Sequence, residues 1–135
     1  MTSHGFEELQ HTADWALHVW ADNLPSLFAE AACGMNSLAG VKLADGPRTS
    51  RTFEIKGADT ESLLIAFLSE LIYAQEHESL GFDQFDIRIR GKKAIVNVKG
   101  ASLMSLTKAI KAATYHNLKI EKTERGYEVV IVFDV

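Results

Sequence analysis

The run Val129–Phe133, close to the end of the 135-residue chain, constrains the fold most strongly. Its five apolar residues, four of them β-branched, place bulky side chains on both faces of any strand they form. We therefore expect Tyr127–Asp134 to be a central strand of a sheet. The preceding segment, Thr114–Lys122, alternates in a way that predicts its hairpin partner, with a turn at residues 124–126.

Two segments predict helices. One begins at Asn23 as N-cap, has Pro25 in its first turn and runs to about Leu38. The other begins at Asp59 and runs to about Glu76. Its apolar residues recur at helical spacing and form a wide stripe that must be buried, composed of Leu63, Leu64, Phe67, Leu68, Leu71 and Ile72.

Shorter alternating segments predict further strands at residues 6–10, 15–21, 51–56, 85–90 and 94–99. Ser102–Lys108 fits either a loop or a short helix. The order of strands and helices predicts an α+β fold, with two helices packed on a mixed, largely antiparallel β-sheet in a single compact domain over residues 1–135.

The net charge of −4 makes the chain a poor binder of phosphate backbones, since that affinity comes from clustered Lys and Arg. We therefore expect protein partners and cations, and no direct nucleic-acid binding. Cys33 is the single cysteine, so no intramolecular disulfide forms. With no signal peptide and no membrane-spanning run, we expect a cytoplasmic protein that does not bind membranes.

Two acidic positions are candidate metal ligands. Asp14 follows His11 in a turn between two predicted strands, and Asp134 ends the central strand beside the terminal carboxylate of Val135. Two neighbouring carboxylates repel each other unless a cation lies between them. Asp14 would complete the site if the first and last strands are neighbours. All-oxygen ligands favour Ca²⁺, with Mg²⁺ or Mn²⁺ as alternatives. A turn aspartate and a solvated tail would explain the same residues.

A second polar group lies at Lys111–His116, where Lys111, Thr114 and His116 come together at the start of a predicted strand. The polar outer face of a half-buried strand explains them equally well. No nucleophile lies beside a base near these positions, so we predict no catalytic residue.

Taken in order, these segments resemble the archease family. The resemblance rests on residues 11–14 (HTAD), the helix around Leu27-Phe28, residues 59–64 (DTESLL), 111–116 (KAATYH) and 133–135 (FDV). Archeases commonly carry a Gly-Glu pair and a histidine upstream of the KAATYH-like segment. Gly100–Ser105 lacks both, a departure that bears on partner contacts and leaves the acidic positions unchanged.

The resemblance implies an accessory protein rather than an enzyme. Archeases activate an RtcB-type RNA ligase in tRNA splicing and RNA repair, by promoting guanylylation of the ligase and multiple turnover. It also implies a calcium site at Asp14, Asp134 and Val135, with His11, Lys111, Thr114 and His116 as partner contacts or supports of the metal ligands. We expect a monomer or a weak homo-oligomer. The alternatives are a chaperone-like module for an RNA-modifying enzyme, such as a tRNA methyltransferase, and a free-standing metal-dependent hydrolase.

Overall fold

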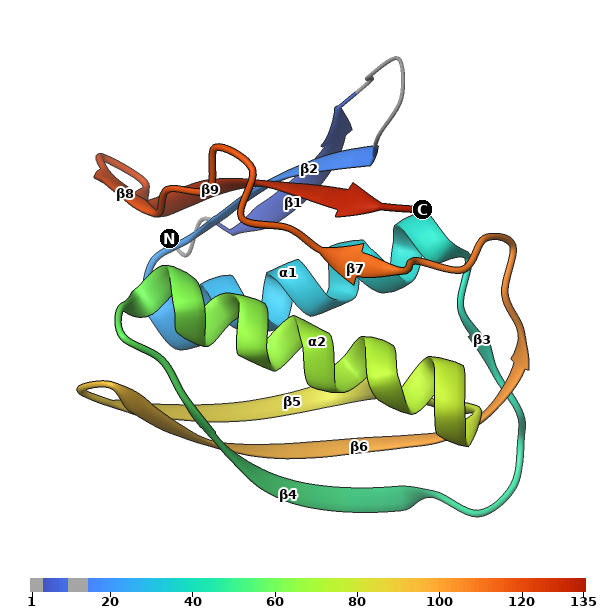
Figure 1. Ribbon diagram of the computed structural model, residues 1–135. Helices are drawn as coiled ribbons and strands as arrows, with labels where there is room; N and C mark the ends of the chain where they lie inside the picture. The colour runs from blue at the N-terminus through green and yellow to red at the C-terminus, as the bar shows by residue number, and fades with distance from the viewer. Residues whose placement is uncertain (1–3, 10–14) are drawn as a thin grey trace.

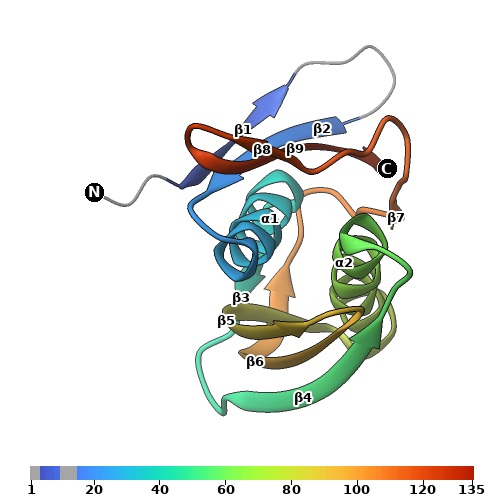
Figure 2. The same ribbon diagram turned by 90° about the vertical axis from the view of Figure 1, so that its left-hand side faces the viewer.

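The computed structural model describes residues 4–9 and 15–135, which form three layers with two helices between two β-sheets (Figure 1, Figure 2). The first sheet consists of β1 (Gly5–Leu9), β2 (Trp15–Ala21), β9 (Gly126–Asp134), β7 (Ala112–Ala113) and β8 (Glu121–Thr123). The second consists of β4 (Thr49–Lys56), β6 (Lys93–Ser105), β5 (Leu80–Arg90) and β3 (Lys42–Leu43). The middle layer is α1 (Leu24–Ala39) and α2 (Thr60–Glu78). Within these described ranges, no helix is long and apolar enough to cross a membrane.

Both helices begin at the predicted caps. The side chain of Asn23 accepts a hydrogen bond from the Ser26 N–H at 2.9 Å, and that of Asp59 accepts one from the Ser62 N–H at 2.8 Å. Each bond satisfies a backbone donor that the first helical turn leaves unpaired. Helix α1 ends at Gly40, whose φ of 65° suits glycine. The predicted helices are thus confirmed, and α2 extends to Glu78.

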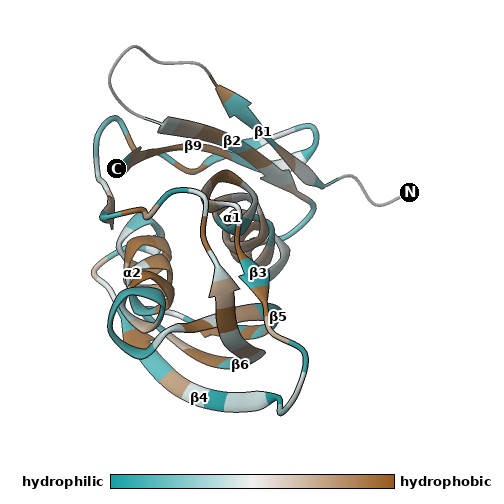
Figure 3. Cartoon of the chain, turned by 90° about the vertical axis from the view of Figure 1, so that its right-hand side faces the viewer, coloured by the Kyte–Doolittle hydropathy of each residue, from teal (hydrophilic) through white to brown (hydrophobic). Residues whose placement is uncertain are grey.

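The core fills the space between the layers. The rings of Phe28 on α1 and Phe67 on α2 stack with centroids 5.8 Å apart, and Phe85 of β5 meets Phe67 edge-on at 6.0 Å. Figure 3 shows β2 and β9 as mainly hydrophobic, whereas β4 carries hydrophilic positions along its length. The helices are therefore buried on two sides, which explains the wide apolar stripe of α2.

Strand β9 is the central strand of the first sheet, as predicted. It pairs with β2 on one edge and with β7 and β8 on the other. Trp15 at the start of β2 lies opposite Phe133 near the end of β9. Strands from the two ends of the chain are therefore neighbours, as a shared site of Asp14 and Asp134 requires.

The α+β class with antiparallel pairing is confirmed, and the strands divide between two sheets with the helices between them. The predicted strand Thr114–Lys122 is wrong. Only Glu121–Thr123 pairs with β9 after the two-residue β7, and residues 114–118 form a turn in which Asn117 has a φ of 50°. For Ser102–Ser105 both expected alternatives, a loop and a short helix, are wrong, because these residues continue strand β6.

Candidate functional site

The end of β9 is held from both sides. The N–H of Lys111 donates to the backbone carbonyl of Asp134 at 2.8 Å, and β7 pairs with the same stretch through Ala112 and Ala113. On the other edge Trp15 pairs with Phe133. The acidic end of the chain is therefore fixed in place by the sheet, as the apolar character of the strand predicted.

The side chains of Asp134 and Val135 differ in their burial. The side chain of Val135 packs against the core, whereas that of Asp134 is exposed and makes no hydrogen bond or ion pair with a described residue. A carboxylate without a protein partner at a fixed position is available to a ligand. Its donor atoms are oxygens, which suits a hard divalent cation.

Asp14 and His11 lie outside the described residues. Trp15, the next residue after Asp14 in the chain, pairs with Phe133, the residue before Asp134. Among residues 4–9 and 15–135, no set of three His, Cys, Asp or Glu side chains is arranged to hold a metal ion. The metal site therefore stays a prediction that depends on Asp14.

Thr114 has a structural task at this edge. Its N–H and its hydroxyl both donate to the carbonyl of Val132, at 3.0 and 2.9 Å. The same hydroxyl oxygen accepts from the N–H of His116 at 3.3 Å, and the amide of Asn117 contacts the His116 ring. Thr114 thus fastens the turn that carries His116 to β9. The structure brings Lys111 to the Asp134 backbone, whereas His116 lies in the turn and contacts Thr114 and Asn117.

One further residue at this edge was missed from the sequence. The amine of Lys108 lies 5.6 Å from the centre of the Trp15 ring, close enough for a cation–π contact. It ties the loop after β6 to the start of β2. No local pattern signals this contact, because it joins residues far apart in the chain.

A groove lies beside Lys111, between this residue and helix α2. We define the α2 groove by Ile72 and Glu76 of α2 together with Leu106, Ile110 and Lys111. It encloses about 320 Å³, and a smaller hollow of about 190 Å³ continues it past Tyr73. Tyr73 is 56% exposed, so an aromatic side chain stands at the edge of a largely apolar groove beside the candidate site.

Cys33 is not a site residue. Burial raises the pKa of its thiol above the ordinary value, with smaller contributions from the charges of Glu30 and Asp83. A neutral, half-buried thiol is a weak nucleophile, as expected from its place on a helix.

The archease family model matches residues 6–135, nearly the whole chain. The chain belongs to the archease family. The Methanosarcina barkeri protein archease is 32% identical and both chains are covered completely; the Methanopyrus kandleri protein archease is 30% identical, over 96% of this chain and 99% of its own. The family assignment given by the sequence resemblance is thus confirmed.

Two solved structures share the fold of this archease. One is the solution structure of a Methanobacterium thermoautotrophicum protein, with a TM-score of 0.71 and 22% identity over 97% of this chain and 99% of that one. The other is the crystal structure of a Thermotoga maritima protein described as an archease and possible chaperone, also with a TM-score of 0.71 and 22% identity, over 96% of each chain. At this identity they establish the three-layer fold alone.

Proposed function

We propose that this archease is a cytoplasmic, metal-binding accessory protein of an RtcB-type RNA ligase, which it activates by promoting guanylylation and multiple turnover. The observation that carries the proposal is the archease match over nearly the full chain, together with the carboxylate of Asp134, which is held at the end of β9 and has no partner in the part of the chain that the structure describes.

The metal ligands in this proposal are Asp14, Asp134 and the terminal carboxylate of Val135, holding Ca²⁺, Mg²⁺ or Mn²⁺. The residues present fit such an ion because the side chain of Asp134 has no partner among residues 4–9 and 15–135, and Val135 is adjacent to it. The pairing of Trp15 with Phe133 supports the participation of Asp14, its neighbour in sequence. A bound divalent ion would neutralise charge on nucleotide phosphates.

The protein's own residues position this site. The Lys111 N–H and β7 hold the Asp134 backbone, and the hydroxyl of Thr114 fixes the adjacent turn. Lys111 also lines the α2 groove, so a partner seated there would reach the acidic edge. We assign the α2 groove as the ligase contact, with Tyr73 as its exposed aromatic anchor.

Calorimetry tests the metal part of this function. Asp14→Asn and Asp134→Asn should each weaken Ca²⁺ binding by about tenfold or more, because each removes a charged ligand. Glu124→Gln, an exposed carboxylate in the turn between β8 and β9, should bind as wild type does. Unchanged affinity in both aspartate variants would remove the metal from the account.

Ligase binding tests the groove. Tyr73→Ala should weaken binding of the ligase roughly tenfold, as expected for an exposed aromatic hot spot, with no loss of thermal stability. Met104→Ala removes a side chain that is 64% exposed and lies outside the groove, so it serves as the matched control. Equal losses in the two variants would place the contact elsewhere.

A second candidate function is a chaperone-like module for an RNA-modifying enzyme. The description of the Thermotoga maritima relative as a possible chaperone and the apolar lining of the α2 groove both favour it. In that case the protein should suppress aggregation of its client without any divalent cation, and Asp134→Asn should retain full activity.

A further inference from the structure

The outer face of the second sheet carries an unusual row of charges. Strand β6 pairs with β4 on one side and β5 on the other, and in this register Lys93 lies between Lys56 and Arg90. Their sequence neighbours Ile55 and Ala94 are buried in the core on the face toward the helices. Because side chains alternate along a strand, Lys56, Lys93 and Arg90 are exposed on the opposite, outer face. Three cations therefore stand side by side across three strands.

These charges are poorly compensated within the protein. Lys56 has a carboxylate of Glu54 at 3.8 Å on its own strand, but neither Arg90 nor Lys93 has a carboxylate partner among the described residues. Like charges directly opposite each other destabilise a sheet. The row therefore costs the fold some stability, and a bound anion would offset that cost.

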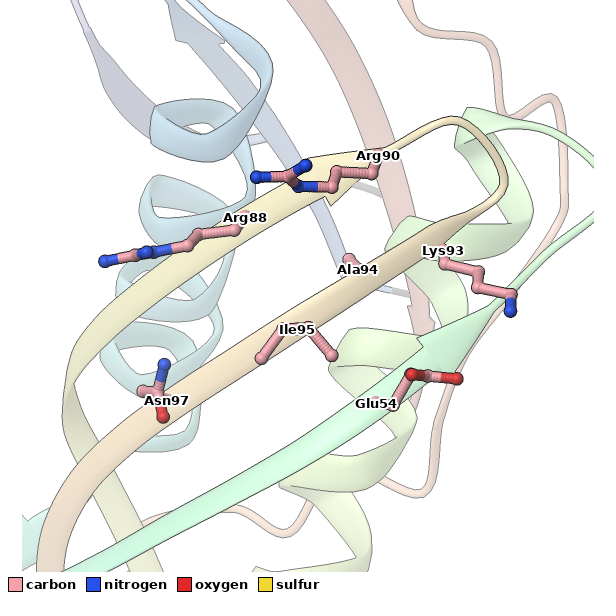
Figure 4. Close-up of a pocket in the computed structure, with 7 residues that line it drawn as sticks. All are labelled: Glu54, Arg88, Arg90, Lys93, Ala94, Ile95 and Asn97. Atoms are coloured by element: carbon pink, nitrogen blue, oxygen red, sulfur yellow. The ribbon is translucent and has the colours of Figure 1, made fainter.

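A hollow runs along β6 beside this row (Figure 4). The short side chains of Ile95 and Asn97 lie between longer ones on the neighbouring strands. The hollow of about 410 Å³ is lined by three cations, Arg88, Arg90 and Lys93, and by one carboxylate, Glu54. A second hollow of about 350 Å³ shares Asn97 and continues to Lys99. The lining of the two hollows is thus net positive, with Arg51, Arg88, Arg90, Lys93 and Lys99 against Glu54 and Asp86. Arg88 and Arg51 are paired with Asp86 and Glu78, so among the described residues of this lining Arg90, Lys93 and Lys99 are the cations available to an anion.

The composition of this groove favours a polyanion over a protein partner. Ile95, 40% exposed, is the single exposed large apolar side chain between Lys93 and Lys99, and no exposed aromatic ring lies there. Protein interfaces are enriched in aromatic anchors and depleted in lysine. Nucleic-acid interfaces are polar and positively charged, and their affinity comes largely from Lys and Arg on phosphates.

We propose that this groove and the adjoining row bind the phosphate backbone of single-stranded RNA. The main phosphate contacts are Arg90 and Lys93, which line the groove, and Lys56, which lies opposite Lys93 in the sheet. The choice of RNA over DNA rests on the proposed function at the other sheet. Without aromatic rings to stack on bases, binding is independent of sequence and strongly dependent on salt. The net charge of −4 led us to expect no nucleic-acid binding, but it does not describe where the cations lie.

Fluorescence anisotropy on the isolated protein tests this site, with a labelled oligouridylate as probe and oligodeoxythymidylate in parallel. Arg90→Gln/Lys93→Gln should weaken oligouridylate binding roughly tenfold at low salt and reduce the slope of log affinity against log salt by about 1.4, or about 0.7 per lost contact. The control Lys42→Gln/Lys122→Gln removes the same charge from exposed positions of β3 and β8 and should change neither quantity by as much.

Folding does not confound the comparison. Because the row is repulsive, Lys93→Glu should raise the melting temperature while it abolishes RNA binding, an opposition that simple unfolding cannot produce. Equal affinity of the groove variant and its control would overturn the proposal. So would binding to phosphatidylserine vesicles without binding to RNA. Because this experiment contains no ligase, a failure to bind RNA would not count against activation of the ligase, which is tested by the guanylylation assay.

Discussion

At the scale of single residues, the end of β9 separates residues that hold the site from residues that remain available. Asp134 is fixed through its backbone while its carboxylate is exposed without a described partner. Thr114 donates hydrogen bonds from both its backbone N–H and its hydroxyl to the carbonyl of Val132. Asp134 is therefore suited to bind a ligand, whereas Thr114 is suited to hold the neighbouring turn in place.

The terminal carboxylate of Val135 gives a prediction that side-chain substitution cannot make. A short peptide extension after Val135 converts this carboxylate into a neutral amide and should weaken Ca²⁺ binding by about tenfold, comparable to loss of a ligand. The same extension before Met1 serves as control, and calorimetry compares the two. Equal affinities would leave the two aspartates as the ligands and exclude Val135.

Thr114→Val should lower the free energy of unfolding by about 1 kcal/mol, since it removes a partly buried hydrogen bond to the Val132 carbonyl. Urea denaturation measures the loss. Thr49→Val is the matched control, because its hydroxyl has no hydrogen-bond partner in the described part of the chain. If both variants lose the same stability, the Thr114 hydroxyl does not fasten the turn.

At the scale of elements, close backbone packing distinguishes the hairpin of β5 and β6. A methyl group on Gly100 would overlap the carbonyl oxygen of Gly81 and lie 2.7 Å from the Cα of Phe82. Both neighbours are backbone atoms, next to a register shift in β5, and cannot move aside. The glycine is required here by lack of space.

Gly100→Ala should therefore destabilise the protein by about 3 kcal/mol, at the upper end of the usual cost of overpacking. Gly91→Ala makes a useful comparison: its φ is 62° but nothing lies within 4 Å, so only the backbone conformation is strained, by about 1 kcal/mol. Thermal unfolding of both variants decides; an equal or larger loss for Gly91 would mean that packing at Gly100 is not limiting.

The same elements show what the sequence can and cannot predict. Asn23 and Asp59 located both helices, because a cap followed by an apolar stripe is a local signal. Residues 114–120 alternate like a strand but do not pair as one. The Leu118 N–H donates to the Tyr115 carbonyl in a turn and the Ile120 N–H donates to Glu61, so neither donor is available to β9. The second sheet and the α2 groove depend on contacts between distant segments, which no local pattern contains.

At the scale of the whole molecule, the two sheets present different outer surfaces. The second carries the basic row, and the first carries a polar cluster around His18, whose ring nitrogens each lie 3.0 Å from a carboxylate oxygen, of Glu7 and of Glu128. Arg125 contacts the same Glu128 oxygen at 3.1 Å. This cluster joins β1, β2 and β9.

A hydrogen bond from Thr123 holds the pKa of Glu128 below its ordinary value; His18 and Arg125 add to this effect and partial burial opposes it. A depressed carboxylate pKa contributes stability above the unfolded-state value of about 4.3 and loses it as pH falls through the lower folded value. The melting temperature of wild type should thus exceed that of Glu128→Gln near neutral pH, and the difference should shrink below about pH 4. A difference independent of pH would show that charge is not involved.

The central claim is that Asp134 and Val135, at the end of β9, act on the ligase. The most direct test is the single-turnover rate of guanylylation of the RNA ligase from the same cell, with Ca²⁺, Mg²⁺ or Mn²⁺ supplied in turn. Wild type and Glu124→Gln should accelerate the reaction, and Asp134→Asn should lose most of the acceleration while its melting temperature is unchanged. Full acceleration by Asp134→Asn, or none by wild type, would contradict the account.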